Sequence, residues 1–262
     1  MSTIDRISQN TEFGGKRLLD GSMGANGTTV GDFLRFVSAE ATTSATPEQG
    51  WKIDIQQIAT RARKSGTVAI DVKNIRNGLQ ILLNEGGRSI SLNTGDGQLG
   101  RDIEQILQNV DQDPVRFPAA EMSTEIRGLV VYTLNQEITE NGLNLQVMET
   151  PDNKLYVQHT DFGDSSSFSV TSSVAGILSA EANIAQTAER GKNVEGTING
   201  EIALGEGQLL TTLNGMEAAG ITIKYDKELG FNEVPVLDEA GVKIGTKLVA
   251  QKIGRASCRE RV

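Results

Sequence analysis

The 262-residue sequence contains one cysteine, one histidine and few aromatic residues. One histidine cannot supply the two histidine ligands of an H-E-x-x-H zinc site, and a single cysteine adds no Cys/His metal cluster. No apolar run approaches the ~20 residues of a membrane span, and the N-terminus lacks the basic start and apolar core of a signal peptide. These absences exclude most enzyme classes, so we expect no catalytic residue, no metal and no cofactor.

The single cysteine, Cys258, lies in the closing stretch IGRASCRERV, which carries three arginines and one glutamate in an otherwise acidic chain. No periodicity connects this stretch to the strand-like VKIGTKLVAQK before it. We therefore interpret 253–262 as a non-native tail and exclude it from fold reasoning. The remaining chain has no cysteine, needs no disulfide and is compatible with export.

What the sequence does contain is glycine, at 29 positions, a 37% share of hydrophobic residues and a net charge of −9. The hydrophobic share is enough to bury a core. Many turns combined with small and β-branched residues predict strand-rich modules with small cores. The negative field repels phosphate backbones, so we expect no nucleic-acid partner.

Runs of β-branched and apolar residues between Gly and Asn turns predict strands along most of the chain. The predicted strands are 67–72, 79–84, 88–93, 129–134, 143–148, 154–159 and 167–172, and the block 193–250 alternates strand and turn. Residues 100–112 predict a helix because Ile103, Ile106, Leu107 and Val110 fall on one face, and 179–189 predicts a second. The Asn199-Gly200 pair predicts a type I′ hairpin turn, in which both central positions have positive φ.

The first residues have a different pattern. Ile4 and Ile7 are spaced as on the last turns of a helix whose beginning is missing. An extended segment then follows at 13–19, and Asp20 and Gly21 predict a turn.

Two candidate chemical sites lack the residues that their chemistry requires. His159 is the one residue that could serve a Ser-His-Asp triad, but no G-x-S-x-G nucleophile elbow exists in the sequence. We predict a solvent-facing or hydrogen-bonded strand histidine instead. In NTGDGQLGRDIE, aligning Gly97 with the turn glycine of a calcium loop puts Leu92 and Ile103 where ligands belong, so the match fails.

The opening stretch IDRISQNTEFGGKRLLDGS resembles the N-terminal region of flagellins, where a long rod helix gives way to a β-turn segment. The residues that carry the resemblance are Ile4, Asp5, Arg6, Ile7, Thr11, Glu12, Phe13, Gly15, Leu18, Leu19, Asp20, Gly21 and Ser22. A second stretch, 191–225, is similar to the flagellin hook IN motif, which also occurs in filament-cap proteins. Its central residues are Gly196, Thr197, Ile198, Asn199 and Gly200.

The resemblance implies a structural subunit of the bacterial flagellar filament that supports motility outside the cell. Its implied partners are other flagellin subunits in a homopolymer, with an export chaperone and hook-associated proteins, and neither nucleic acid nor a membrane. The helical regions at both ends of a flagellin are expected to be missing from this chain. We expect Phe13, Leu18 and Leu19 to anchor the turn segment. The residues expected in the core of the last module are Ile198, Ile221 and Ile223.

The fold class expected is α+β, with β-rich outer modules and short helices after the end of a truncated rod helix and β-turn segment. The expected divisions are the rod end and turn segment (1–31), a variable β/α module (32–127), a second one (128–190), the hook IN module (191–252) and the tail (253–262).

Three alternatives stay open. The shared GTINGE motif also fits a hook-associated or cap protein. An adhesin or glycan-binding module would use exposed aromatic residues, for which the candidates are Trp51, Tyr132 and Tyr156, although Trp51 also fits a packing role. An enzyme displayed in the variable region is disfavoured by the single histidine.

Overall fold

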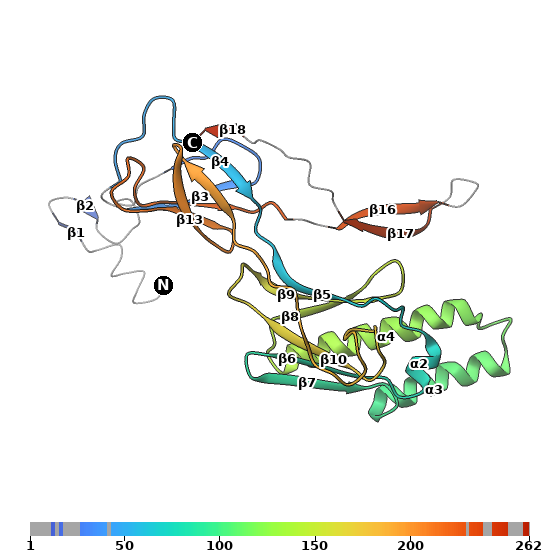
Figure 1. Ribbon diagram of the computed structural model, residues 1–262. Helices are drawn as coiled ribbons and strands as arrows, with labels where there is room; N and C mark the ends of the chain where they lie inside the picture. Colours follow the sequence, from blue (N-terminus) through green and yellow to red (C-terminus); the bar gives the residue numbers. More distant parts are fainter. Residues whose placement is uncertain are drawn as a thin grey trace. The chain divides into compact units, whose positions relative to one another are not determined.

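The computed structural model describes residues 27–40 and 43–228 in full (Figure 1). Outside these ranges it describes only the backbone of β1 (Glu12–Phe13), β2 (Lys16–Arg17), β16 (Phe231–Leu237), β17 (Lys243–Ala250) and β18 (Arg259–Arg261). Contacts divide the chain into two compact units. Unit 1 combines Met1–Ala59, Asn193–Glu228 and Ile253–Val262, and unit 2 combines Thr60–Lys192 and Leu229–Lys252. Strands outnumber helices in the described residues, which confirms the α+β class.

Unit 1 is built on a seven-stranded antiparallel sheet with the order β18-β4-β12-β13-β14-β15-β3. Its fully described strands are β3 (Leu34–Ala39), β4 (Lys52–Gln57), β12 (Glu195–Ile198), β13 (Glu201–Glu206), β14 (Leu209–Thr212) and β15 (Ile221–Tyr225). Side chains alternate between the two faces of the sheet. One face buries Trp51, Ile53, Ile198, Leu210, Ile221, Ile223 and Tyr225, so the three isoleucines expected in this core are confirmed there.

The fully described residues of unit 2 form two smaller sheets and three helices. One sheet has the order β11-β10-β6-β7 and the other the order β5-β9-β8. The strands are β5 (Arg61–Ser65), β6 (Gln80–Glu85), β7 (Arg88–Asn93), β8 (Leu145–Glu149), β9 (Leu155–Phe162), β10 (Phe168–Ser172) and β11 (Gln186–Thr187). The helices are α2 (Val72–Arg76), α3 (Gly97–Gln112) and α4 (Ala119–Glu140).

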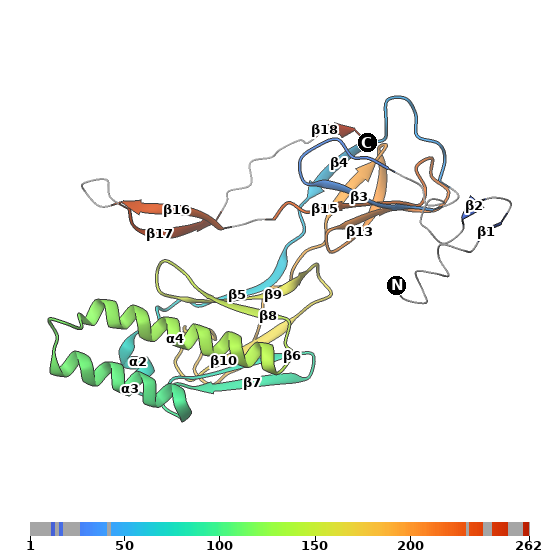
Figure 2. The ribbon, with the colours of Figure 1, turned by 180° about the vertical axis from the view of Figure 1, so that it is seen from behind.

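The helices α3 and α4 form a hairpin in unit 2 and lie side by side in Figures 1 and 2. The helix α4 also packs against β8. Its core-facing side chains recur every four residues, at Ile126, Val130, Leu134 and Ile138, and are at most 3% exposed. This spacing places them on one face of the helix, where they join the aliphatic core of both sheets.

Three predicted segments have a different structure. Residues 129–134 lie inside α4 and not in a strand, because the run LVVYTL belongs to the four-residue repeat of buried side chains. The predicted boundary between 127 and 128 therefore falls within this helix. Residues 179–189, predicted as a helix, form turns and the short strand β11.

The third wrong prediction is the strand at 67–72. The backbone N–H groups of Thr67 and Val68 both donate to the carbonyl oxygen of Gly176, at 2.8 and 2.9 Å. Two successive N–H groups thus share one acceptor, which is the pattern of a loop contact and not of a strand ladder. The predictions of β6, β7, β8, β9, β10 and α3 are confirmed.

Candidate functional site

The residues of the opening stretch mostly lie outside the described residues. This holds for Ile4, Ile7, Thr11, Gly15, Leu18, Leu19, Asp20 and Gly21. The backbone of Glu12 and Phe13 pairs with that of Lys16 and Arg17 in an antiparallel bridge. Of the extended segment expected at 13–19, Phe13, Lys16 and Arg17 lie in these strands, and the roles expected for the side chains stay predictions.

The motif at Gly196–Gly200 forms the hairpin between β12 and β13. Asn199 has φ 55° and Gly200 has φ 83°, as a type I′ turn requires, so the predicted turn is confirmed. Ile198 is fully buried. The hairpin lies in the interior of the seven-stranded sheet, since β4 and β14 flank it.

A close approach of two strands explains the first glycine of the motif. The register between β12 and β4 shifts between Glu195 and Gly196. A Cβ atom added at Gly196 would lie 2.4 Å from the carbonyl oxygen of Asp54, a separation that real Cβ atoms do not adopt. The motif residues therefore come together as one element whose residue types are set by backbone geometry and packing.

His159 lies on β9 and is only 3% exposed. Its Nδ1 accepts a hydrogen bond from the backbone N–H of Asp161 at 2.9 Å, and its Nε2 lies 2.9 Å from Oε1 of Glu85. Because Nδ1 accepts, the proton of the neutral ring is on Nε2, which donates to Glu85. The other carboxylate oxygen of Glu85 accepts from the backbone N–H of Asn144 at 2.8 Å. The predicted hydrogen-bonded strand histidine is confirmed, and it connects the two sheets of unit 2.

The three aromatic candidates for ligand contact have different surroundings. Trp51 is 3% exposed and packs in the core of unit 1, whereas Tyr132 on α4 is 67% exposed. Tyr156 is 7% exposed but lines a pocket in unit 2. Tyr156 therefore contributes to a concave site.

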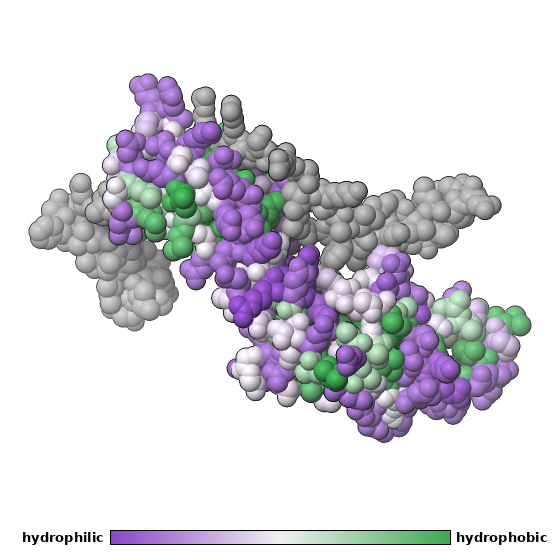
Figure 3. All heavy atoms as spheres, in the orientation of Figure 1, coloured by the Kyte–Doolittle hydropathy of each residue, from purple (hydrophilic) through white to green (hydrophobic). Residues whose placement is uncertain are grey.

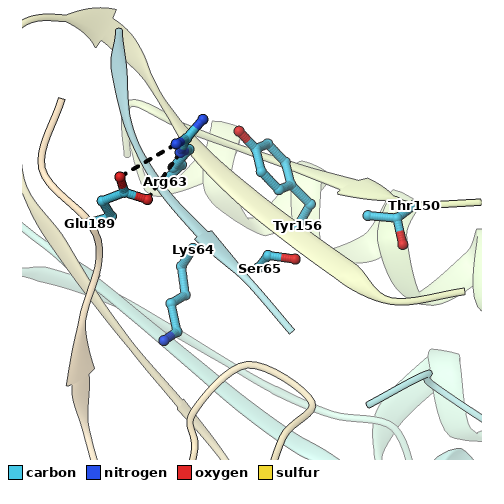
Figure 4. A pocket seen from close by; sticks show the side chains of 6 residues that line it. All are labelled: Arg63, Lys64, Ser65, Thr150, Tyr156 and Glu189. Carbon is cyan, nitrogen blue, oxygen red and sulfur yellow. Dashed lines mark hydrogen bonds and ion pairs between the residues drawn. The ribbon is translucent and has the colours of Figure 1, made fainter. Parts of the chain in front are cut away.

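This pocket has a volume of about 430 Å³ and is lined by Arg63, Lys64, Ser65, Thr150, Tyr156 and Glu189 (Figure 4). The guanidinium of Arg63 forms a forked pair with the carboxylate of Glu189, with Nε to Oε2 at 3.1 Å and Nη2 to Oε1 at 3.4 Å. The Tyr156 hydroxyl points toward the same guanidinium, while the Lys64 side chain extends away from both (Figure 4).

Two pKa values in this pocket are perturbed. Burial raises the pKa of the Tyr156 phenol, and the positive charge of Arg63 offsets part of that rise. The hydrogen bond to Glu189 raises the pKa of Arg63, which stays charged. Of this site the sequence pointed to Tyr156 alone, because residues 63–65, 150, 156 and 189 are brought together by the folding of unit 2.

No group of histidine, cysteine and acidic residues suited to a metal ion is found in the part of the chain that the structure describes. No helix of the described residues is long and apolar enough to span a membrane. Hydrophilic side chains dominate the surface seen in Figure 3, with smaller apolar patches between them.

The geometry defines a two-unit α+β protein in which an antiparallel sheet carries an inserted mixed unit. No family model matches the sequence, and no curated protein matches it. Several solved structures align with it. The D2-D3 domains of the flagellar cap protein FliD from Escherichia coli align with 76% of this chain and 91% of theirs, at 10% identity and TM-score 0.44.

Two further solved structures align similarly. The FliD D2-D3 domains from Serratia marcescens cover 75% of this chain and 94% of theirs, at 11% identity and TM-score 0.42. FliD (HAP2) from Pseudomonas aeruginosa PAO1 covers 81% of this chain and 84% of its own, at 13% identity and TM-score 0.38. At these identities and TM-scores the alignments establish no common function.

Proposed function

We propose that this chain is an extracellular structural component of the bacterial flagellum, of the cap or hook-associated kind. The observation that carries the proposal is the hairpin at Gly196–Gly200. Its sequence is similar to the hook IN motif of flagellins and filament-cap proteins, and its residues form an interior element of the unit 1 sheet. Ile198 is buried, and at Gly196 the two strands approach closely, so these residues maintain the fold of the sheet. This favours a structural function.

A filament subunit is the second candidate. The observation that favours it is the resemblance of residues 4–22 to flagellins, whereas the described hairpin has a sequence common to flagellins and cap proteins. Because both candidates share the hairpin motif, the position of the protein on the flagellum decides between them.

In either role, the partners would be further copies of the chain and other proteins of the flagellar axis, together with an export chaperone. We propose no catalytic role. Both ring nitrogens of the single histidine, His159, are engaged in hydrogen bonds: Nε2 with Glu85 of the other sheet, and Nδ1 with the backbone N–H of Asp161 on the same strand. This supports a non-enzymatic protein.

Immunogold electron microscopy of the source bacterium tests the proposal. Antibodies raised against the purified chain should label the tip of each flagellum or its junction with the hook. Labelling along the whole filament would favour the filament subunit instead. Flagella without label, in cells that contain the protein by immunoblot, would overturn both forms. Antibodies preabsorbed with the purified chain serve as the control.

A further inference from the structure

The pocket between β5 and Glu189 has no part in the flagellar role proposed above. All six lining residues belong to unit 2, so the site is complete within one compact body. We call it the β5 pocket. Its volume of about 430 Å³ falls in the range of small-molecule sites, about 300–1,000 Å³.

The backbone of β5 forms one wall of the β5 pocket. Arg63 exchanges both of its backbone hydrogen bonds with Glu189, at 2.9 and 2.8 Å. In an antiparallel strand, alternate residues direct their peptide groups to the same edge, so those of Ser65 point to the side where Glu189 lies. The chain next to Glu189 turns away there, because the Ala188 N–H donates to Phe168 at 2.9 Å. This divergence opens the pocket beside Ser65.

The polar groups of the β5 pocket form a donor–acceptor array. The forked pair of Arg63 and Glu189 places guanidinium N–H donors next to carboxylate acceptors. The guanidinium has five N–H donors and the carboxylate about four acceptor positions, so both keep capacity beyond the pair itself. The hydroxyl groups of Ser65 and Thr150 can both donate and accept.

The charges of this array cancel. Arg63 and Glu189 carry opposite charges, and the ammonium group of Lys64 extends to the other side of the strand (Figure 4). The ring of Tyr156 supplies an apolar wall on the same side as the pair. A ligand for this site therefore needs adjacent groups that both donate and accept hydrogen bonds, an apolar face and no net charge.

We propose that the β5 pocket binds a neutral sugar residue through two neighbouring hydroxyl groups. One hydroxyl donates to the Glu189 carboxylate and the other accepts from the Arg63 guanidinium. The C–H face of the sugar packs along the Tyr156 ring, and Ser65 and Thr150 contact the remaining hydroxyls. Hydrogen bonds to charged groups are stronger than neutral ones, so the pair supplies most of the orientation.

The test is an NMR titration of the full, isotope-labelled chain with the methyl glycosides of glucose, galactose and mannose. Methyl glucuronide and an extended, blocked tripeptide serve as the acidic-sugar and peptide arms. At least one neutral glycoside should shift the amide signals of residues 63–65, 150, 156 and 189 in a saturable way. Single sugars make few contacts, so a dissociation constant of about 1 mM is expected.

Matched variants distinguish the array from a general surface effect. Glu189→Ala and Arg63→Met should each weaken glycoside binding about tenfold or more, since each removes a hydrogen bond to a charged group. Lys73→Gln, at an exposed position of α2 outside the pocket lining, should leave binding unchanged. Amide spectra that are otherwise unaltered show that each variant is folded.

The proposal fails if no neutral glycoside shifts these signals, or if the shifts lie elsewhere in the chain. It also fails if binding is confined to methyl glucuronide and lost in Lys64→Gln, because the site then recognises an anion. Binding of the tripeptide alone would instead assign the open edge of β5 to a peptide strand. None of these results bears on where the protein lies on the flagellum, which the gold labelling decides separately.

Discussion

The side-chain amide of Asn135 on α4 pairs with both backbone polar groups of Val147 on β8. Its Nδ2 donates to the Val147 carbonyl oxygen at 2.8 Å, and its Oδ1 accepts from the Val147 N–H at 2.9 Å. The strand β8 is the last in its sheet, so a helix side chain occupies the place of a missing neighbouring strand. Unpaired strand edges promote association between chains, and this amide closes the edge at its centre.

Replacement of Asn135 by Leu should therefore destabilise unit 2. The variant leaves the N–H and C=O of the 2%-exposed Val147 without this partner, at a cost of about 1–3 kcal/mol for each buried group. Urea unfolding followed by the helical circular dichroism signal measures the change, since α3 and α4 belong to unit 2. Gln136→Ala, on the exposed side of the same helix, should stay within about 0.5 kcal/mol. Equal effects of the two changes would contradict the edge-capping role.

Gly128 offers a change of opposite sign. It lies in the interior of α4, is exposed, and a Cβ atom added there would meet nothing within 4 Å. Gly128→Ala should raise the free energy of unfolding of unit 2 by about 0.5–1 kcal/mol, because alanine loses less backbone entropy in a helix.

The matched control for that change is Gly142→Ala, measured by the same unfolding experiment. Gly142 follows the end of α4 with φ 65°, which an alanine adopts only with strain of about 1–2 kcal/mol. The two alanine variants should thus shift the urea midpoint in opposite directions, and a stabilised Gly142→Ala would refute the assigned backbone geometry.

Gly200→Val should destabilise unit 1 through the turn alone. A Cβ at this position has open space, but φ 83° is unfavourable for a β-branched residue by about 1–2 kcal/mol or more. Trp51, the single tryptophan of the chain, is buried in unit 1, so its fluorescence reports this transition. Asn199→Gly, which also accepts positive φ, should be nearly neutral. An unchanged Trp51 transition in Gly200→Val would count against the type I′ turn.

The pKa of Tyr156 gives a prediction for alkaline pH. Its pKa is raised above 10.0 in the folded state, chiefly by burial, so the neutral phenol is favoured by folding. That contribution is complete below pH 10 and is lost as the pH rises through the folded-state pKa. Stability should fall more steeply above pH 10 in the wild type than in Tyr156→Phe. Ultraviolet titration of the two proteins should give a difference curve with its midpoint above 10.0, and a midpoint at or below that value would contradict the assignment.

Several elements could be predicted from local sequence because their signal is local. The helix α3 has its apolar residues at helical spacing, and the turn at Asn199-Gly200 has the residue types that positive φ requires. The strands β6 and β7 are short β-rich runs separated by the turn glycines Gly86 and Gly87. In each case local preference and tertiary packing agree.

The missed elements depend on contacts distant in sequence. In α4, the run LVVYTL has strand preference when taken alone, and the helix is stabilised by packing of Val130 and Leu134 in the core. The segment 67–72 is held by Gly176, and the β5 pocket requires Glu189 to reach β5 across more than a hundred residues. Neither signal is contained in a short window of sequence.

The division of the chain has a consequence for how such a protein can vary. The fully described part of unit 2 starts at Thr60 and ends at Lys192, and these two residues pair through backbone hydrogen bonds of 2.9 and 3.2 Å. The chain therefore passes from β4 into this segment and returns from it into β12. These two strands are neighbours in one sheet, so the segment connects them in the way that a hairpin loop connects two strands. Any compact module with its ends one strand spacing apart, about 5 Å, could replace it while the sheet of unit 1 keeps its register. The segment between β4 and β12 can therefore be exchanged, in evolution or by design, without changing the strands of the unit 1 sheet.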